Sequence, residues 1–175
     1  LGLESEQLMP IDPLHTPSAS ASSNELESNP AVAVLRMASG QPKAPLSNLH
    51  ALSRMLDGMP LALRVTGARA RQRSWPAIQS ALEDALLPEA GSTPTRSRVA
   101  EIALNSAMDD LPLEVLETLN GLSVFCGGFS LTAAGAVVGP DAADHIDHLV
   151  AASLIQTLGP GRWTLPPAIQ DMASE

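Results

Sequence analysis

The sequence predicts a mainly α-helical fold, in which a helical bundle is followed by a winged-helix subdomain with a small β-hairpin wing. Of the 175 residues, 45% are hydrophobic, but they are mostly Leu, Ala, Val, Ile and Met, and Tyr does not occur. Such a composition favours helices over sheets. Apolar residues recur at helical spacing along most of the chain. From Leu154 the pattern changes to two short strands around Gly159-Pro160-Gly161, which predicts the wing.

The first 28 residues predict an extended arm and a flexible connection. Residues 1–14 hold scattered apolar residues with Pro10 and Pro13, a pattern that disfavours a helix. Residues 15–28 are rich in Ser and Ala and low in hydrophobicity. Such a composition is typical of a flexible linker, so we expect no regular structure there.

Residues 29–87 predict a helical subdomain of four helices. Each helix has a start signal, either a polar N-cap residue or a proline at the first helical position. The expected starts are Asn29-Pro30, Ser47, Pro60 and Ser74, and the first three helices are expected to end near Gly40, at Gly58 and at Arg73.

Residues 88–95, PEAGSTPT, predict the linker between two domains, because prolines, a glycine and small hydroxyl residues interrupt two helical stretches. Residues 96–175 then predict the winged-helix subdomain. Four amphipathic stretches precede the hairpin: VAEIALNSAMDD, LEVLETLNGLSVF, LTAAGAVV and AADHIDHLVAASL. Short helices, a small hairpin and a last helix follow one another as in a winged helix.

The charge distribution disfavours nucleic-acid binding. The formal net charge is −9, whereas phosphate binding needs a basic surface. Residues 96–175 contain three arginines and ten acidic residues, a net charge of −7. A stand-alone winged-helix transcription factor, the first alternative function, is therefore disfavoured, because its recognition helix would approach phosphates. We expect any DNA contact to be made by a domain outside this chain.

Cysteine content and hydropathy indicate a cytoplasmic protein. Cys126 is the single cysteine, so no intrachain disulfide can form, which fits a reducing compartment. No apolar run approaches the roughly 20 residues that a membrane helix needs. The chain begins with Leu1 rather than Met, so we expect a fragment or a processed product.

Several motifs resemble one family. LDGMPLALRVTGARAR, Leu56 to Arg71, resembles the "GLPLAL" segment of bacterial STAND or NB-ARC-like ATPases, and LSVFCGGFSLTAAGAVV, Leu122 to Val138, resembles their "LSVFAGGFTLEAAEAV" signature. The last 28 residues resemble the region that follows, and residues 1–14 resemble the end of the nucleotide-binding domain. The resemblance implies a parent that acts as a nucleotide-dependent switch in signal transduction, often as a transcriptional regulator.

The resemblance also implies a ligand contact. In the family the proline of this segment approaches bound ADP or ATP, so we expect Gly58, Met59, Pro60 and Leu61 to contact the adenine side of the nucleotide in the intact parent. The alternative is a helix corner without a ligand, because such a corner needs the phosphate site to complete it. The implied partners are the chain's own nucleotide-binding domain and effector domains, and an apolar face left by the missing domain would favour self-association.

Two departures limit what this chain can do. It contains no GxxxxGK[ST] phosphate loop, so we expect it to be no enzyme and to hold no cofactor alone. Plant and animal relatives carry a Met-His-Asp motif, for which Leu165-Pro166-Pro167 stands here. Two prolines cannot supply the histidine contact.

Three other patterns have a functional and a simpler interpretation. Asp144 and His148 have the i, i+4 spacing of a metal-ligand pair, but a solvated helix face is favoured, because a third ligand is missing. Arg64, Arg69, Arg71 and Arg73 favour surface salt bridges over phosphate contacts. Cys126 favours a small buried side chain over a nucleophile. A helical scaffold that binds a partner peptide is the second alternative function, and it predicts an apolar groove between the two halves.

Overall fold

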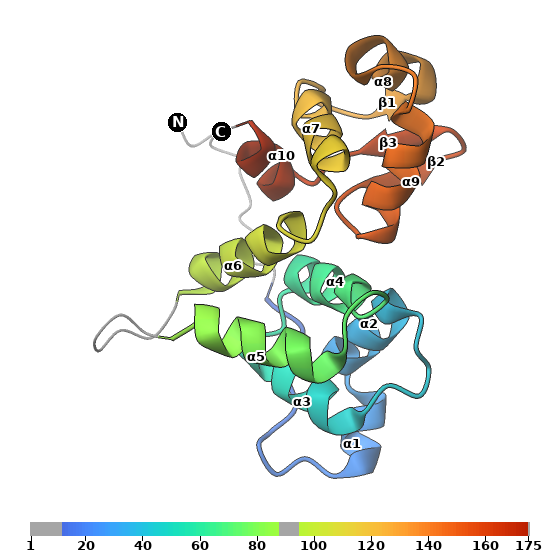
Figure 1. Ribbon diagram of the computed structural model, residues 1–175. Coiled ribbons are helices and arrows are strands. Elements are labelled where there is room, and N and C mark those ends of the chain that lie inside the picture. The colour runs from blue at the N-terminus through green and yellow to red at the C-terminus, as the bar shows by residue number, and fades with distance from the viewer. Residues whose placement is uncertain (1–11, 88–94, 175) are drawn as a thin grey trace, which may run out of the picture.

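The computed structural model describes residues 12–87 and 95–174. Within these ranges the chain forms ten α-helices and one three-stranded antiparallel sheet, so the predicted fold class, mainly helical with a small hairpin, is confirmed. The first five helices form the lower half of Figure 1, and the sheet lies in the upper half with the later helices. None of the helices in the described ranges has the length and apolar character that a membrane crossing requires.

The first half contains five helices: α1 (Ser23–Ser28), α2 (Pro30–Ser39), α3 (Leu46–Met55), α4 (Pro60–Arg69) and α5 (Trp75–Ala85). The predicted start of α2 is confirmed, because the side chain of Asn29 accepts hydrogen bonds from the amides of Ala31 and Val32 at 3.0 and 3.3 Å. Its predicted end is also confirmed, since Gly40 adopts the left-handed C-cap conformation with φ 66°.

Helix α1 corrects the expectation that residues 15–28 have no regular structure. Ser22 and Glu25 form a capping box, in which the Ser22 side chain accepts from the Glu25 amide and the Glu25 carboxylate accepts from the Ser22 amide. Leu26 is buried, which attaches the helix to the bundle. Before it, Nε2 of His50 lies 2.8 Å from the carbonyl oxygen of Ser18 and ties this segment to α3.

Three other boundaries differ from the predicted ones. Helix α3 ends at Met55 rather than at Gly58, although the Gly58 amide still donates to the carbonyl oxygen of Ser53 in its last turn. Helix α3 begins at Leu46, and Ser47 lies inside it, because Pro45 occupies the N-cap position without a side-chain cap. Helix α4 ends at Arg69 rather than Arg73. The carbonyl oxygen of Ala70, which a longer helix would use internally, accepts instead from the side-chain amide of Gln41 at 2.6 Å.

The second half contains α6 (Arg96–Met108), α7 (Leu113–Leu122), β1 (Phe129–Ser130), α8 (Leu131–Val138), α9 (Ala142–Ala151), β2 (Gln156–Gly159), β3 (Arg162–Thr164) and α10 (Pro167–Ala173). The predicted hairpin is formed by β2 and β3. Strand β1 was not predicted; it pairs with β3, where Phe129 lies opposite Trp163, and the strand order is β1-β3-β2. A two-residue strand is too short to show any periodicity in the sequence. The order of helices, short strands and hairpin from α7 onward is winged-helix-like.

Two hydrophobic cores lie in the molecule, and helices α4 and α6 contribute to both. Leu63 of α4 and Ala103 of α6 belong to the core of the helical bundle. Val65 of α4 and Leu104 of α6 belong to the core of the winged-helix-like half. Residues 88–94 of the predicted linker lie outside the described residues. Helix α6, expected as the first element of the winged-helix subdomain, therefore also packs against the bundle.

Gly67 allows α4 to lie very close to α2. A Cβ atom at this position would be 2.7 Å from the carbonyl oxygen of Leu35 and 2.8 Å from Cβ of Ala38. Both distances are shorter than a carbon side chain permits, so only glycine fits without a shift. This contact fixes α4 in the bundle and, with it, the turn that precedes α4.

Candidate functional site

The turn between α3 and α4 holds the four residues predicted to contact a nucleotide. We call Asp57–Leu61 the Gly58 turn. Asp57 and Gly58 both adopt positive φ angles, 46° and 66°, and the Gly58 amide donates to the carbonyl oxygen of Ser53 at 3.3 Å. Two successive left-handed residues reverse the chain sharply. Pro60 then starts α4 with its ring exposed to solvent.

The N-terminal segment covers Gly58. The amide of Leu14 donates to the carbonyl oxygen of Gly58 at 2.9 Å, and a Cβ on Gly58 would lie 1.9 Å from the carbonyl oxygen of Leu14. Gly58 is thus required for two reasons, its φ angle and the close approach of a second backbone. Nothing in the local sequence around Gly58 indicates the second reason, because Leu14 is far away in the chain.

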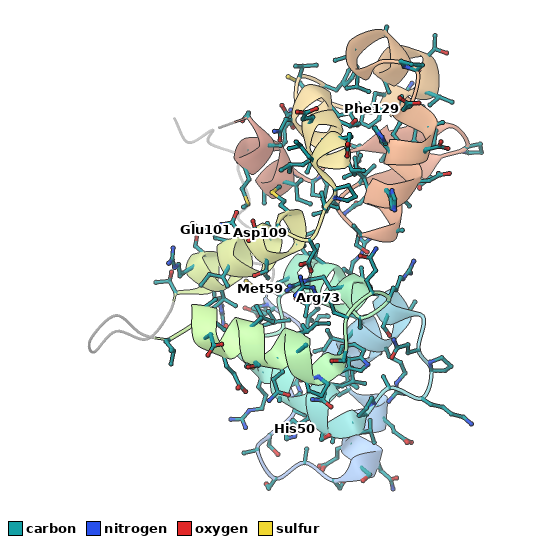
Figure 2. All side chains as sticks on the ribbon, viewed as in Figure 1. His50, Met59, Arg73, Glu101, Asp109 and Phe129 are labelled. Carbon is teal, nitrogen blue, oxygen red and sulfur yellow. The ribbon has the colours of Figure 1, made fainter. Side chains whose placement is uncertain are left out.

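The side chains of the Gly58 turn point into different surroundings. Met59 is half-buried and packs against the bundle core, whereas Leu61 is half-buried and packs against the second core. Pro60, between them, is exposed. Figure 2 labels Met59 near the middle of the molecule, between the bundle and the winged-helix-like half. Of the four predicted residues, Pro60 is therefore the one that is exposed to solvent, whereas Gly58 is buried.

A buried ion pair joins the end of α4 to the segment after α6. Nε of Arg69 donates to Oδ2 of Asp110 at 2.7 Å, and Nη2 of Arg73 lies 2.5 Å from Oδ1 of the same carboxylate. The side chains of Arg69 and Asp110 are 6% and 14% exposed. Nη1 of Arg69 is buried without a hydrogen-bond partner in the described residues. The expectation of surface salt bridges is thus wrong for Arg69, because the packing of α6 onto α4 covers it.

A second ion pair lies at the opposite end of α4. Arg96, the first residue of α6, donates from Nε to Oδ2 of Asp57 in the Gly58 turn. Since Arg96 starts α6 and Asp110 follows its end, α4 and α6 run in the same direction side by side. We call this contact the α4/α6 joint. Its exposed pair at the start contributes little free energy, whereas the buried pair at the end is costly to break.

Helix α9 occupies the position before the hairpin that a recognition helix takes in DNA-binding winged helices. It exposes Asp144, Asp147 and His148, and from Ala142 to Ala151 it contains neither Lys nor Arg. Nδ1 of His145 lies 2.7 Å from the hydroxyl of Thr118, so this histidine is used in packing. In the part of the chain that the structure describes, no three His, Cys, Asp or Glu residues are grouped as metal ligands.

Cys126 is exposed, which corrects the expectation of a buried side chain. It lies in the loop between α7 and β1, where the rings of Phe125 and Phe129 stack with centroids 5.1 Å apart. These rings fill the interior at this corner and leave the intervening Cys126 on the outside. Burial of the two rings is favoured over burial of the Cys126 side chain, because the rings have the larger apolar area.

The segment Leu165-Pro166-Pro167, in place of the Met-His-Asp motif, leads from β3 into α10. Leu165 and Pro166 are buried, and Pro167 is the first residue of the helix. The segment therefore fills the core and starts a helix. It offers no side-chain group that could bind a phosphate.

Comparison with known proteins adds no relative from which a role could be transferred. No family model matches this chain, and no curated protein matches it. The nucleotide contact at Gly58, Met59, Pro60 and Leu61 stays a prediction from resemblance. The geometry adds the position of these residues, at the start of the helix that joins the two cores.

Proposed function

We propose that this chain is the helical and winged-helix part of a nucleotide-dependent signalling switch of the STAND or NB-ARC-like type. In this function it packs on a nucleotide-binding domain and relays the state of that domain to effector domains. The chain itself performs no chemistry. ADP or ATP is bound by the parent, in a cytoplasmic protein that regulates transcription through a separate DNA-binding domain.

The observation that carries the proposal is the position of the Gly58 turn at the α4/α6 joint. The residue before Pro60 packs against one core and the residue after it against the other. A ligand that moved this turn would therefore act on both halves at once. Since α4 and α6 are packed helices with fixed side-chain contacts, a small shift at the turn favours one discrete arrangement of the halves over another.

The charge of the winged-helix-like half supports a role in relaying the nucleotide state to a protein partner rather than a role in binding DNA. The exposed carboxylates of Asp144 and Asp147 lie on α9, the helix that would enter the major groove. Carboxylates facing DNA phosphates are repelled, and no arginine or lysine on this helix offsets them. A protein partner is consistent with such a surface.

The groove between the halves favours a second candidate, a helical scaffold that binds a protein partner. It is formed by α2 and α4 on one side and by the end of α9 on the other, with apolar walls at Val34 and Val150. This is the feature that a scaffold predicts. The two candidates are separable, because the groove and the Gly58 turn share no residue.

Calorimetric titration tests the first candidate. ADP and ATP are titrated into this chain and into a version extended at its N-terminus through the nucleotide-binding domain. We expect only the extended protein to bind, and Pro60→Ala to weaken its affinity about tenfold, as for the loss of about two buried CH₂ groups. Pro30→Ala is the matched control, because Pro30 is also an exposed proline at the first position of a helix.

Two results would count against the switch. If the extended protein binds neither nucleotide, the Gly58 turn is a structural corner and the scaffold becomes the leading candidate. If Pro60→Ala and Pro30→Ala weaken binding equally, the effect comes from helix starts in general, and Pro60 has no contact with the nucleotide.

A further inference from the structure

A groove of about 340 Å³ separates the helical bundle from the end of α9. Seven residues line it: Val34, Met37, Ala38, Arg64, Arg71, Val150 and Ser153. Its volume lies within the range of roughly 300–1,000 Å³ that ligand sites have. Four of the lining residues are apolar and three are polar, and Met37 is 79% exposed, so a flexible apolar side chain stands at the edge of the groove.

Two arginines add positive charge to these apolar walls. Nε of Arg71 donates to the carbonyl oxygen of Ala38 at 3.0 Å, which holds the guanidinium group against the end of α2. In the described residues, no carboxylate lies within ion-pair distance of Arg64 or Arg71. The η nitrogens of both side chains are thus available to an acceptor from another molecule. This matters in a chain of net charge −9 with only ten basic residues.

The spacing of the two arginines defines the ligand further. They are seven residues apart along α4 and the turn after it, about 10 Å at the helical rise of 1.5 Å per residue. A peptide in the polyproline II conformation rises about 3.1 Å per residue and has three residues per turn, so two carboxylates three positions apart lie on the same side, about 9 Å from each other. The side chains of the two residues between them then point to the other two sides of the peptide, toward the apolar side chains of the groove.

We propose that this groove binds a peptide segment in which two acidic residues flank two apolar ones. The carboxylates pair with Arg64 and Arg71, and the apolar side chains lie against Val34 and Val150. The winged-helix-like half is acidic and repels such a segment, so charge complementarity favours the two arginines on the bundle side of the groove. Because Val150 belongs to α9 and Val34 to α2, the bound segment connects the two halves. The proposal specifies the ligand of the scaffold candidate and does not depend on nucleotide binding.

The test is an NMR titration of the whole ¹⁵N-labelled chain with the peptide acetyl-Asp-Leu-Leu-Glu-amide. We expect concentration-dependent amide shifts at Met37, Ala38 and Val150. Arg64→Gln and Arg71→Gln each remove one charge-assisted hydrogen bond, so each is expected to weaken binding about tenfold. Arg54→Gln is the matched control, since Arg54 is an exposed arginine on α3 outside the groove and is expected to leave the affinity unchanged.

The peptide acetyl-Lys-Leu-Leu-Lys-amide keeps the apolar residues and reverses the charge, and we expect it not to bind. Equal binding of both peptides, shifts outside the groove, or no shifts at millimolar peptide would overturn the proposal. A loss of peptide affinity in Arg54→Gln equal to that in the two groove variants would also overturn the proposal. Because no nucleotide is present, failure here leaves the switch candidate untouched, and failure of the nucleotide titration leaves this one untouched. The amide spectra of the variants also report whether they are folded.

Discussion

Nε of Arg69 donates a hydrogen bond of 2.7 Å to Oδ2 of Asp110, and these two residues stand 41 positions apart in the sequence. The contact closes the end of the α4/α6 joint and places a charged side chain in the interior. A buried guanidinium that loses its carboxylate keeps the cost of desolvation without the attraction. The stability of the joint therefore depends on Asp110 more than on any exposed charge.

Asp110→Ala is expected to lower the free energy of unfolding by about 3 kcal/mol, because it leaves Arg69 buried and unpaired. Urea unfolding followed by circular dichroism measures the change. The control is Asp109→Ala, since Asp109 is exposed and adjacent in sequence, and its effect is expected to stay within about 0.5 kcal/mol. Equal losses in the two variants would show that the buried pair contributes nothing specific.

Gly67→Ala is expected to destabilise the fold by about 1–3 kcal/mol, although alanine is the better helix former, because its Cβ would overlap the backbone of α2. Gly135→Ala is the matched control within α8. A Cβ at Gly135 meets nothing within 4 Å, so this variant is expected to gain up to about 1 kcal/mol from helix propensity. Thermal unfolding of both variants separates the two effects. A gain of stability in Gly67→Ala would refute the close contact of α2 and α4.

Gly58→Ala and Gly40→Ala separate backbone strain from steric overlap, because both glycines have φ 66°. Only Gly58 faces another backbone, that of Leu14, whereas Gly40 meets nothing within 4 Å. Gly40→Ala is expected to cost about 1–2 kcal/mol from the left-handed conformation alone. Gly58→Ala is expected to cost more and to expose the Leu14 amide to hydrogen exchange. Unchanged protection of that amide would mean that Leu14 does not cover the turn.

The capping box of α1 makes Glu25 sensitive to pH. The Ser22 amide, and then the Ser22 hydroxyl, donate to the Glu25 carboxylate and hold its pKa below the ordinary value. Because the folded state favours the charged form, this contribution is present above the ordinary pKa and is lost as the pH falls through the lowered one. A side-chain NMR titration should show the low pKa. In Ser22→Ala, which keeps the amide donor, the pKa is expected to rise part of the way back.

Most helix types and several ends could be predicted, because their signals lie within a few residues. The caps of α2 at Asn29 and Gly40 are examples, and so is the hairpin around Gly161. The capping box at Ser22 and Glu25 was also present in the sequence, but the Ser- and Ala-rich composition around it pointed to a linker. Composition is a weaker indicator than a reciprocal cap, since a cap satisfies specific backbone donors.

The candidate site was predictable only in part. The proline of the Gly58 turn and the reversal before it follow from local chemistry, whereas the cover by Leu14 and the ion pair of Asp57 with Arg96 do not. The four arginines of residues 64–73 look alike in sequence. In the structure Arg69 and Arg73 share the carboxylate of Asp110, while Arg64 and Arg71 line the groove.

By itself, the sequence determined the helical character of the chain, the order of most of its elements and the acidic character of its winged-helix-like half. These properties depend on residue types and on spacings of a few positions. Only the tertiary structure decided which charges are buried, that α6 belongs to both cores, that Cys126 is outside, and that a groove lined by Arg64 and Arg71 lies between the halves. Such properties arise when helices distant in sequence pack together, and the packing free energy is shared among many side chains rather than held in any local motif.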